Sequence, residues 1–84
     1  MKIALQAVPN IDFADDDRQV ALHTVEVKDI AEAKTVLNNF IVDGGLGSGN
    51  FTTRTGRVCG DDGVWFVTIS YNLRVWDPSG KEIV

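Results

Sequence analysis

Apolar and polar positions alternate at the start of the chain, which predicts two strands joined by a polar connection. Ile3, Leu5 and Ala7 occupy every second position between residues 2 and 8, which is the period of a half-buried strand. Pro9 and Asn10 end this segment, and an acidic connection follows over residues 11–17. Alternation resumes over residues 18–27, so a second and longer strand is expected there.

After Lys28 the period changes to that of a helix. Asp29 is a favourable N-cap residue, and Glu32 three positions later completes a capping box. One helical face is apolar, at Ile30, Ala33, Val36, Leu37, Phe40 and Ile41. Gly44 and Gly45 can adopt the left-handed backbone conformation that ends a helix. We therefore expect one amphipathic helix that packs through this stripe.

Alternation returns in the second half of the chain. It predicts strands over residues 54–59, 64–70 and 73–77, separated by turns at 60–63 and 71–72. A further turn is expected at 77–80, and the tail 81–84 is compatible with one more edge strand. Before these strands, the glycine-rich segment 44–50 is expected to be a flexible link. Gly56 indicates a bulge or a close backbone approach.

The predicted elements follow the order β-β-α-β-β-β. The sequence therefore predicts one α+β domain over residues 1–84, with a four- or five-stranded antiparallel sheet in one layer and one helix in the other. The strand over 64–70 is apolar on both sides, because Trp65, Val67 and Ile69 alternate with Val64 and Phe66. A single helix covers one face of a sheet, so a protein partner or a second copy is expected on the other face.

Composition and charge narrow the class of protein. The chain has 84 residues, of which 44% are hydrophobic, and a formal net charge of −4, which suits a small folded domain rather than a disordered tail. No apolar run approaches the ~20 residues that span a bilayer, and the start of the chain does not match a secretory signal. Because Cys59 is the single cysteine, we expect a cytoplasmic protein with neither a disulfide nor membrane contact.

The residue spacings in this chain do not match known motifs for catalysis, cofactor binding or metal binding. The glycines of 44–50 follow a helix instead of preceding one, so they do not match a phosphate-binding loop, and the acidic run lacks the glycine of a calcium loop. His23 and Cys59 could be neighbours in the sheet, but one such pair is neither a zinc site nor an activated thiol. We therefore expect no enzymatic activity, no cofactor and no metal, and the negative net charge opposes direct binding of nucleic acid.

Two groups of residues are candidates for binding a protein partner. The first is acidic and would face a basic groove; it consists of Asp12, Asp15, Asp16 and Asp17 with Asp61 and Asp62 of the 60–63 turn. The second is aromatic, and aromatic side chains supply much of the binding energy at protein interfaces; it consists of Phe66, Tyr71 and Trp76, from a cluster that also contains Trp65. The same aromatic residues are also compatible with a place in the core.

Segments 45–51 (GLGSGNF) and 69–77 (ISYNLRVWD) resemble small proteins carried by phages, prophages and plasmids. The wider layout, a strand pair, one helix and further strands that end in Arg-Val-Trp76, is similar to that of small anti-CRISPR proteins. The resemblance implies an inhibitor without enzymatic activity that binds a CRISPR effector complex in the bacterial host and blocks it by occupying its surface. A homodimeric structural or assembly module of a phage or plasmid is the alternative.

Overall fold

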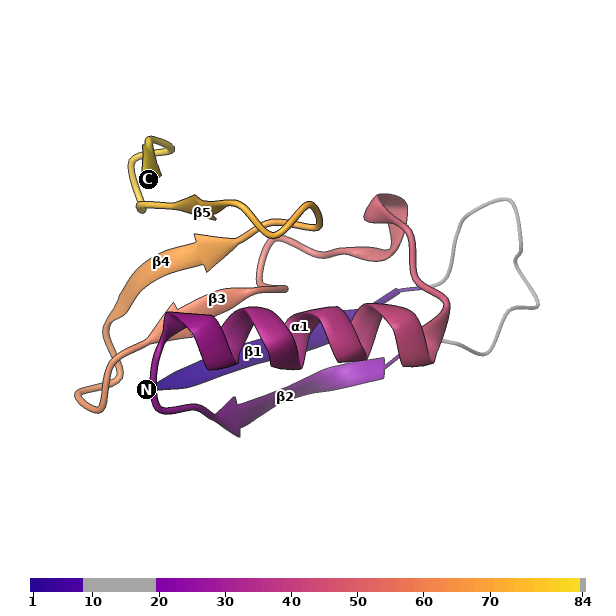
Figure 1. The fold of residues 1–84 in the computed structure, drawn as a ribbon, viewed down its shortest axis with the longest axis horizontal. Helices are drawn as coiled ribbons and strands as arrows, with labels where there is room; N and C mark the ends of the chain where they lie inside the picture. The colour runs from indigo at the N-terminus through magenta and orange to yellow at the C-terminus, as the bar shows by residue number, and fades with distance from the viewer. Residues whose placement is uncertain (9–19, 84) are drawn as a thin grey trace.

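The computed structural model describes residues 1–8 and 20–83, which form an antiparallel sheet in one layer and a helix in the other (Figure 1). In chain order the elements are β1 (Lys2–Ala7), β2 (Val20–Glu26), α1 (Ile30–Gly44), the short 3-10 helix η1 (Ser48–Asn50), β3 (Arg57–Cys59), β4 (Trp65–Ile69), β5 (Val75–Trp76) and β6 (Glu82–Ile83). The strands lie in the order β2-β1-β3-β4-β5-β6, and all neighbours are antiparallel. The expected α+β class is confirmed.

The sheet has six strands in the described residues, so the expected number of four or five was too low. The additional strand comes from the tail. The Asp77 carboxylate accepts hydrogen bonds from the Ser79 and Lys81 backbone amides at 2.9 and 3.0 Å, and the Asp77 amide donates to the Lys81 carbonyl at 2.8 Å. This turn reverses the chain and places Glu82 beside Trp76.

The helix follows its sequence signals closely. The Asp29 side chain accepts a hydrogen bond from the Glu32 amide at 2.8 Å, which is the first half of the expected capping box. The Glu32 carboxylate accepts from the Lys28 amide at 3.2 Å instead of the Asp29 amide, so the second half is shifted by one residue. Gly45 ends the helix with φ +60°. Ala33 and Leu37 are completely buried, and the other members of the apolar stripe pack against the same core. In Figure 1, α1 lies in front of β1, and β2 runs beside the helix. The predicted helix and its buried face are therefore confirmed.

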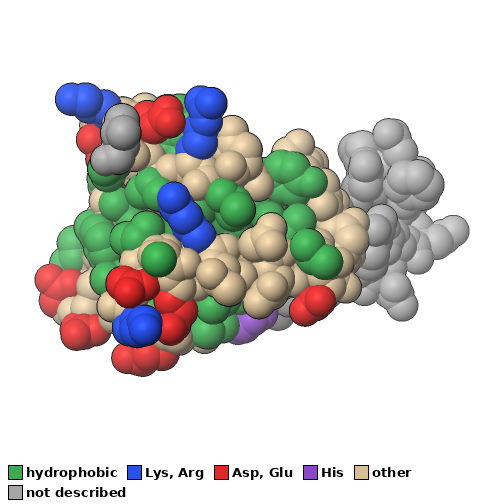
Figure 2. Space-filling model, in the orientation of Figure 1, with side chains coloured by type: hydrophobic (Ala, Val, Ile, Leu, Met, Phe, Trp, Pro, Cys, Tyr) green, Lys and Arg blue, Asp and Glu red, His purple; other side chains and the backbone are tan. Residues whose placement is uncertain are grey.

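The core lies between α1 and the facing side of the sheet. Ile3 is fully buried at its centre, paired with Val25 of β2 on one side and Val58 of β3 on the other. Figure 2 has the same viewpoint and shows hydrophobic side chains above α1, over β3 and β4, where the single helix does not reach. It also shows acidic side chains at the end of the molecule where α1 begins.

The segment after α1 is more ordered than the sequence predicted. Its glycines favoured a flexible link, yet Asn50 is buried and ties the segment to the end of β1. The Asn50 side chain accepts from the Gly47 amide and donates to the Val8 carbonyl, both at 2.8 Å. The Val8 amide returns a bond to the Asn50 carbonyl at 3.0 Å. One polar side chain therefore fixes a segment whose composition predicts mobility.

The third strand is shorter than expected, beginning at Arg57 rather than residue 54. The reason is a turn that ends at Gly56, whose φ of +86° lies in the left-handed region. The Gly56 amide donates to the Ala4 carbonyl at 2.8 Å, and its carbonyl accepts from the Ile69 amide at 2.9 Å. A Cβ atom at this position would lie 2.1 Å from the Ile69 carbonyl oxygen. The predicted close approach is thus confirmed.

Gly56→Ala should lower the free energy of unfolding by more than about 1–2 kcal/mol, because both the positive φ and the Ile69 carbonyl oppose a side chain. Gly49→Ala is the matched control, since a Cβ atom there meets nothing within 4 Å; it should change stability by less than about 0.5 kcal/mol. Urea unfolding measures both. Equal midpoints for the two variants would contradict the close approach.

Leu37→Ala should cost about 2–5 kcal/mol, because it opens a cavity at a completely buried position of a small core. Val42→Ala removes apolar atoms from the same helix at a site that is 68% exposed, so the control should lose well under 1 kcal/mol. Thermal and urea unfolding of both variants test the helix orientation. A larger loss for Val42→Ala would contradict it.

Candidate functional site

The face of the sheet that points away from α1 is the candidate functional surface, here called the open face. Successive side chains of a strand point to opposite sides, so the neighbours of buried Ile3 and Val58 lie on it. No helix of the described residues covers this face. The register places on it Lys2, Ala4, Thr24, Glu26, Arg57, Cys59, Trp65, Phe66, Thr68 and Trp76.

A β-bulge brings Trp65 to the open face. Val58 pairs with Val67, whereas Cys59 pairs with Trp65, so β4 has one extra residue between these pairs. Strict alternation had placed Trp65 on the same side as Val67 and Ile69, and that expectation was wrong because the bulge reverses the alternation. Phe66 precedes buried Val67 and also lies on the open face, where it is 37% exposed.

Arg57 and Trp65 contact each other on the open face. The Arg57 guanidinium carbon lies 3.9 Å from the centre of the Trp65 ring, a cation–π distance. The indole N–H donates to the Val67 carbonyl at 2.9 Å and to the Thr68 hydroxyl at 3.0 Å. Within the described residues Arg57 has no carboxylate partner, and its buried Nε makes no hydrogen bond. The guanidinium is therefore held by an aromatic ring rather than by an ion pair.

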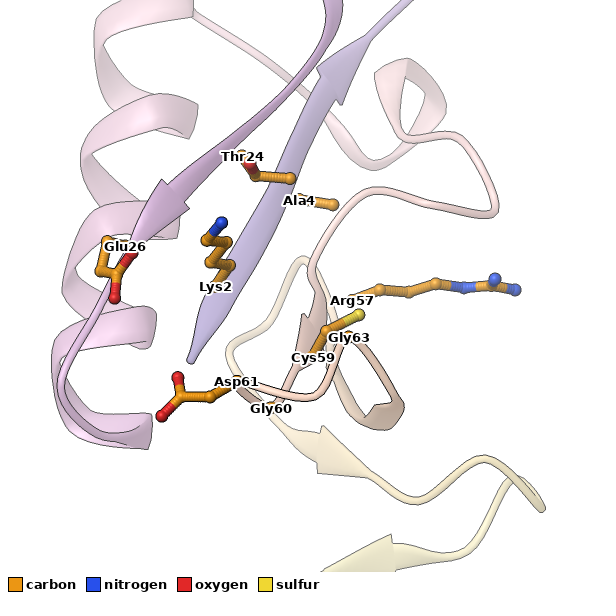
Figure 3. Close-up of a pocket in the computed structure, with 9 residues that line it drawn as sticks. All are labelled: Lys2, Ala4, Thr24, Glu26, Arg57, Cys59, Gly60, Asp61 and Gly63. Carbon is orange, nitrogen blue, oxygen red and sulfur yellow. The ribbon is translucent and has the colours of Figure 1, made fainter.

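A shallow pocket of about 470 Å³ adjoins this pair on the open face. It is lined by Lys2, Ala4, Thr24, Glu26, Arg57, Cys59, Gly60, Asp61 and Gly63 (Figure 3). In Figure 3 the Lys2 side chain lies on the same side as Glu26 and Asp61, whereas the Arg57 guanidinium extends away from them. The pocket therefore combines opposite charges at one end with the small Ala4 and Cys59 side chains and the stem of Arg57 at the other.

His23 and Cys59 are separated by the sheet. Cys59 lines the pocket on the open face. His23 pairs with Leu5 on the helix side, where its ring meets Phe40 edge to face at 6.2 Å between centres. The thiol–imidazole pair considered from the sequence does not form. In the described part of the chain, no group of three or more His, Cys, Asp or Glu residues could hold a metal ion.

The two acidic residues of the β3–β4 hairpin take part in local contacts. The Asp61 carboxylate lies 2.9 Å from the N-terminal ammonium of Met1. That hydrogen bond and the ammonium charge lower the pKa of Asp61, with a smaller contribution from Lys2. Asp62 accepts a hydrogen bond from the Val64 amide at 3.0 Å. Both carboxylates are nevertheless exposed. The other predicted acidic residues, Asp12, Asp15, Asp16 and Asp17, lie outside the described residues.

The predicted aromatic group is divided by the fold. Phe66 lies on the open face with Trp76, which pairs with Thr68 and whose indole N–H donates to the Ser70 hydroxyl at 3.1 Å. Tyr71 packs elsewhere. Its ring meets Phe51 edge to face at 5.7 Å, and its hydroxyl donates to the Leu46 carbonyl at 3.3 Å. Tyr71 therefore packs against the segment that follows α1 and not on the open face.

Sequence reasoning missed the contribution of Lys2 and Arg57 to this surface. It included Trp65 in the aromatic cluster, but alternation set Trp65 opposite Phe66, whereas the bulge places both on the open face. Alternation in β1 does place Lys2 opposite Ile3, so Lys2 could have been found from the first strand alone. The contact between Arg57 and Trp65 depends on the bulge in β4 opposite Cys59. No local feature of the sequence predicts this bulge.

Comparison of the chain with models of protein families, with curated proteins and with solved structures found no match. Among the described residues, no helix has the length and apolar character needed to cross a membrane.

Asp61→Asn should destabilise the protein near neutral pH by removing the attraction to the N-terminal ammonium. A lowered folded-state pKa gives stability that is present above the unfolded pKa, near 4, and lost as pH falls through the folded value. The difference in melting temperature between wild type and variant should therefore shrink below about pH 4. Added salt at pH 7 should also reduce it, because the pair is exposed. A difference that is constant from pH 2 to pH 7 would contradict this pairing.

Proposed function

We propose that this chain is a protein-binding module without enzymatic activity that uses its open face to contact and inhibit a protein complex. The observation that carries the proposal is the group formed by Trp65, Phe66, Trp76 and Arg57 on a face that no described helix covers. Tryptophan and arginine are the residue types most enriched among those that dominate binding energy.

The surface is already ordered before any partner arrives. Both indole N–H groups are hydrogen-bonded within the chain, and Arg57 stacks on Trp65. Fixing side chains on binding costs ~0.5–1.5 kcal/mol each, so a preformed group of this kind lowers the cost of association. Phe66 is exposed, whereas Trp65, Trp76 and Arg57 are half-buried, so Phe66 supplies apolar area for the contact.

The pocket favours binding over thiol chemistry. The chain contains a single histidine, and it lies on the side of the sheet away from Cys59. The charged groups at the pocket, Lys2, Glu26 and Asp61, lie near one another at its edge (Figure 3). Charged and polar groups at the margin of an apolar contact are typical of protein interfaces.

Charge indicates the kind of partner. The chain carries a net charge of −4, and acidic side chains gather at the end of the molecule where α1 begins (Figure 2). Exposed Asp29 is the N-cap of α1, and exposed Asp61, next to Asp62 in the chain, pairs with the Met1 ammonium. A basic surface would attract this end, and such steering raises association rates. Complexes that hold nucleic acid present basic surfaces. The resemblance in layout to anti-CRISPR proteins makes a CRISPR effector complex in the bacterial cytoplasm the partner that we propose, with Asp12, Asp15, Asp16 and Asp17 adding to the attraction.

Biolayer interferometry of the chain against a panel of purified, guide-loaded CRISPR effector complexes tests the proposal by measuring direct binding. We expect at least one complex to bind and to lose target cleavage. Phe66→Asp should weaken that binding at least about 10-fold through faster dissociation, since it places a charge in the contact. Val42→Asp makes the same change at an exposed site on α1 and should leave affinity unchanged.

Binding to none of the complexes would refute the proposed inhibitory function. Equal losses for Phe66→Asp and Val42→Asp would remove the open face from the contact. If the wild type instead forms a dimer that Phe66→Asp dissociates, the open face binds a second copy, and the assembly-module function replaces the inhibitor.

A further inference from the structure

The two edges of the sheet differ in how far they resist pairing with another strand. The β6 edge is only two residues long, and Pro78 and Lys81 precede it. Short edge strands, proline and lysine all discourage edge-to-edge association. The β2 edge is longer, and its run from Leu22 to Glu26 contains neither proline nor lysine. An edge of this kind is a template for another strand.

Hydrogen bonds at the end of β2 show which of its backbone groups point outward. The Val27 amide donates to the Met1 carbonyl at 2.9 Å, and the Met1 ammonium donates back to the Val27 carbonyl at 3.3 Å. Bonded and non-bonded pairs alternate along an antiparallel ladder. With the register Ile3–Val25 and Leu5–His23, Val25 and His23 therefore bond inward to β1.

The amides and carbonyls of Leu22, Thr24 and Glu26 consequently point away from β1, toward the edge. The regular register ends at His23, because Ala7 pairs with Val20 after a bulge. Leu22 is the next residue after His23 along the same alternation, so the three sets of outward groups, at Leu22, Thr24 and Glu26, are centred on Thr24. An added strand that bonds to all three of these residues must therefore place its own central residue opposite Thr24.

We propose that a second copy of this chain pairs with the β2 edge, antiparallel and with the two-fold axis at Thr24. In this register Thr24 faces Thr24 of the second copy, and Leu22 faces Glu26 of the second copy. The pairing joins two six-stranded sheets into one. It goes beyond the proposed function, because it uses backbone groups of β2 and leaves Phe66 and Trp76 uncovered.

The composition of β2 favours its own copy as the occupant. Threonine opposite threonine is a favourable cross-strand pair, whereas like charges directly opposite each other are unfavourable. The symmetric register keeps Glu26 away from Glu26 of the second copy and sets it against Leu22, whose side chain is 40% exposed. A two-fold pairing also closes on itself, so it yields a dimer rather than an open fibre.

The helices leave room for this arrangement. α1 packs on β1, one strand in from the edge. Two copies of α1 would therefore lie about three strand spacings apart, roughly 14 Å at ~4.8 Å each. Packed helices need only 8–10 Å between their axes, so the helices do not collide across the axis.

Analytical ultracentrifugation of the full chain from about 1 µM to 1 mM tests the proposal. Wild type should form a dimer. Thr24→Pro removes an amide that points outward, so it should raise the dimer dissociation constant at least about 10-fold while the far-UV spectrum is retained. Thr24→Lys places like charges on the axis and should act in the same direction. Thr53→Lys adds the same charge at an exposed site away from the edge and should leave the dimer intact.

Amide hydrogen exchange gives a second readout that a general loss of stability would not reproduce. Exchange at Leu22 and Thr24 should slow as concentration rises, while exchange at Val25 should change little. A chain that stays monomeric at 1 mM would overturn the proposal, as would a dimer that resists both Thr24 variants. Phe66→Asp should not affect this dimer, so the result is independent of whether the open face binds an effector complex.

Discussion

The backbone of Gly56 joins the two halves of the sheet. β1 and β3 share only two register pairs, and Gly56 adds a bond to Ala4 of β1 and another to Ile69 of β4. Any side chain at residue 56 would enter the Ile69 carbonyl. The strands that carry Trp65, Phe66 and Trp76 are therefore positioned relative to β1 through a residue that must lack a Cβ atom.

Elements governed by local interactions could be predicted from the sequence. Asp29 and Gly45 act on amides and carbonyls within a few residues, so the helix and its buried stripe are confirmed. β1 is confirmed for the same reason, since its period of two needs no distant information. The sixth strand escaped a firm prediction because two residues carry too little pattern, and its pairing depends on the Asp77 turn.

The candidate surface was harder to predict because it depends on distant contacts. A single extra residue in β4 reverses the side of Trp65, and alternation alone cannot show that. Tyr71 is drawn to Phe51 and Leu46 by tertiary packing, so it leaves the group in which sequence proximity placed it. Asn50 orders a glycine-rich segment through bonds to Val8, which composition could not indicate.

The central position of β1 has a consequence for how the chain folds. Its partner β2 and the covering helix are encoded next, so these elements are synthesised together and can dock early. Its other partner, β3, comes only after α1. Pairing across such sequence separations slows folding. Until residues 57–59 arrive, one side of β1 presents unpaired amides and carbonyls, and this nascent edge is the point at which the growing chain is most exposed to aggregation.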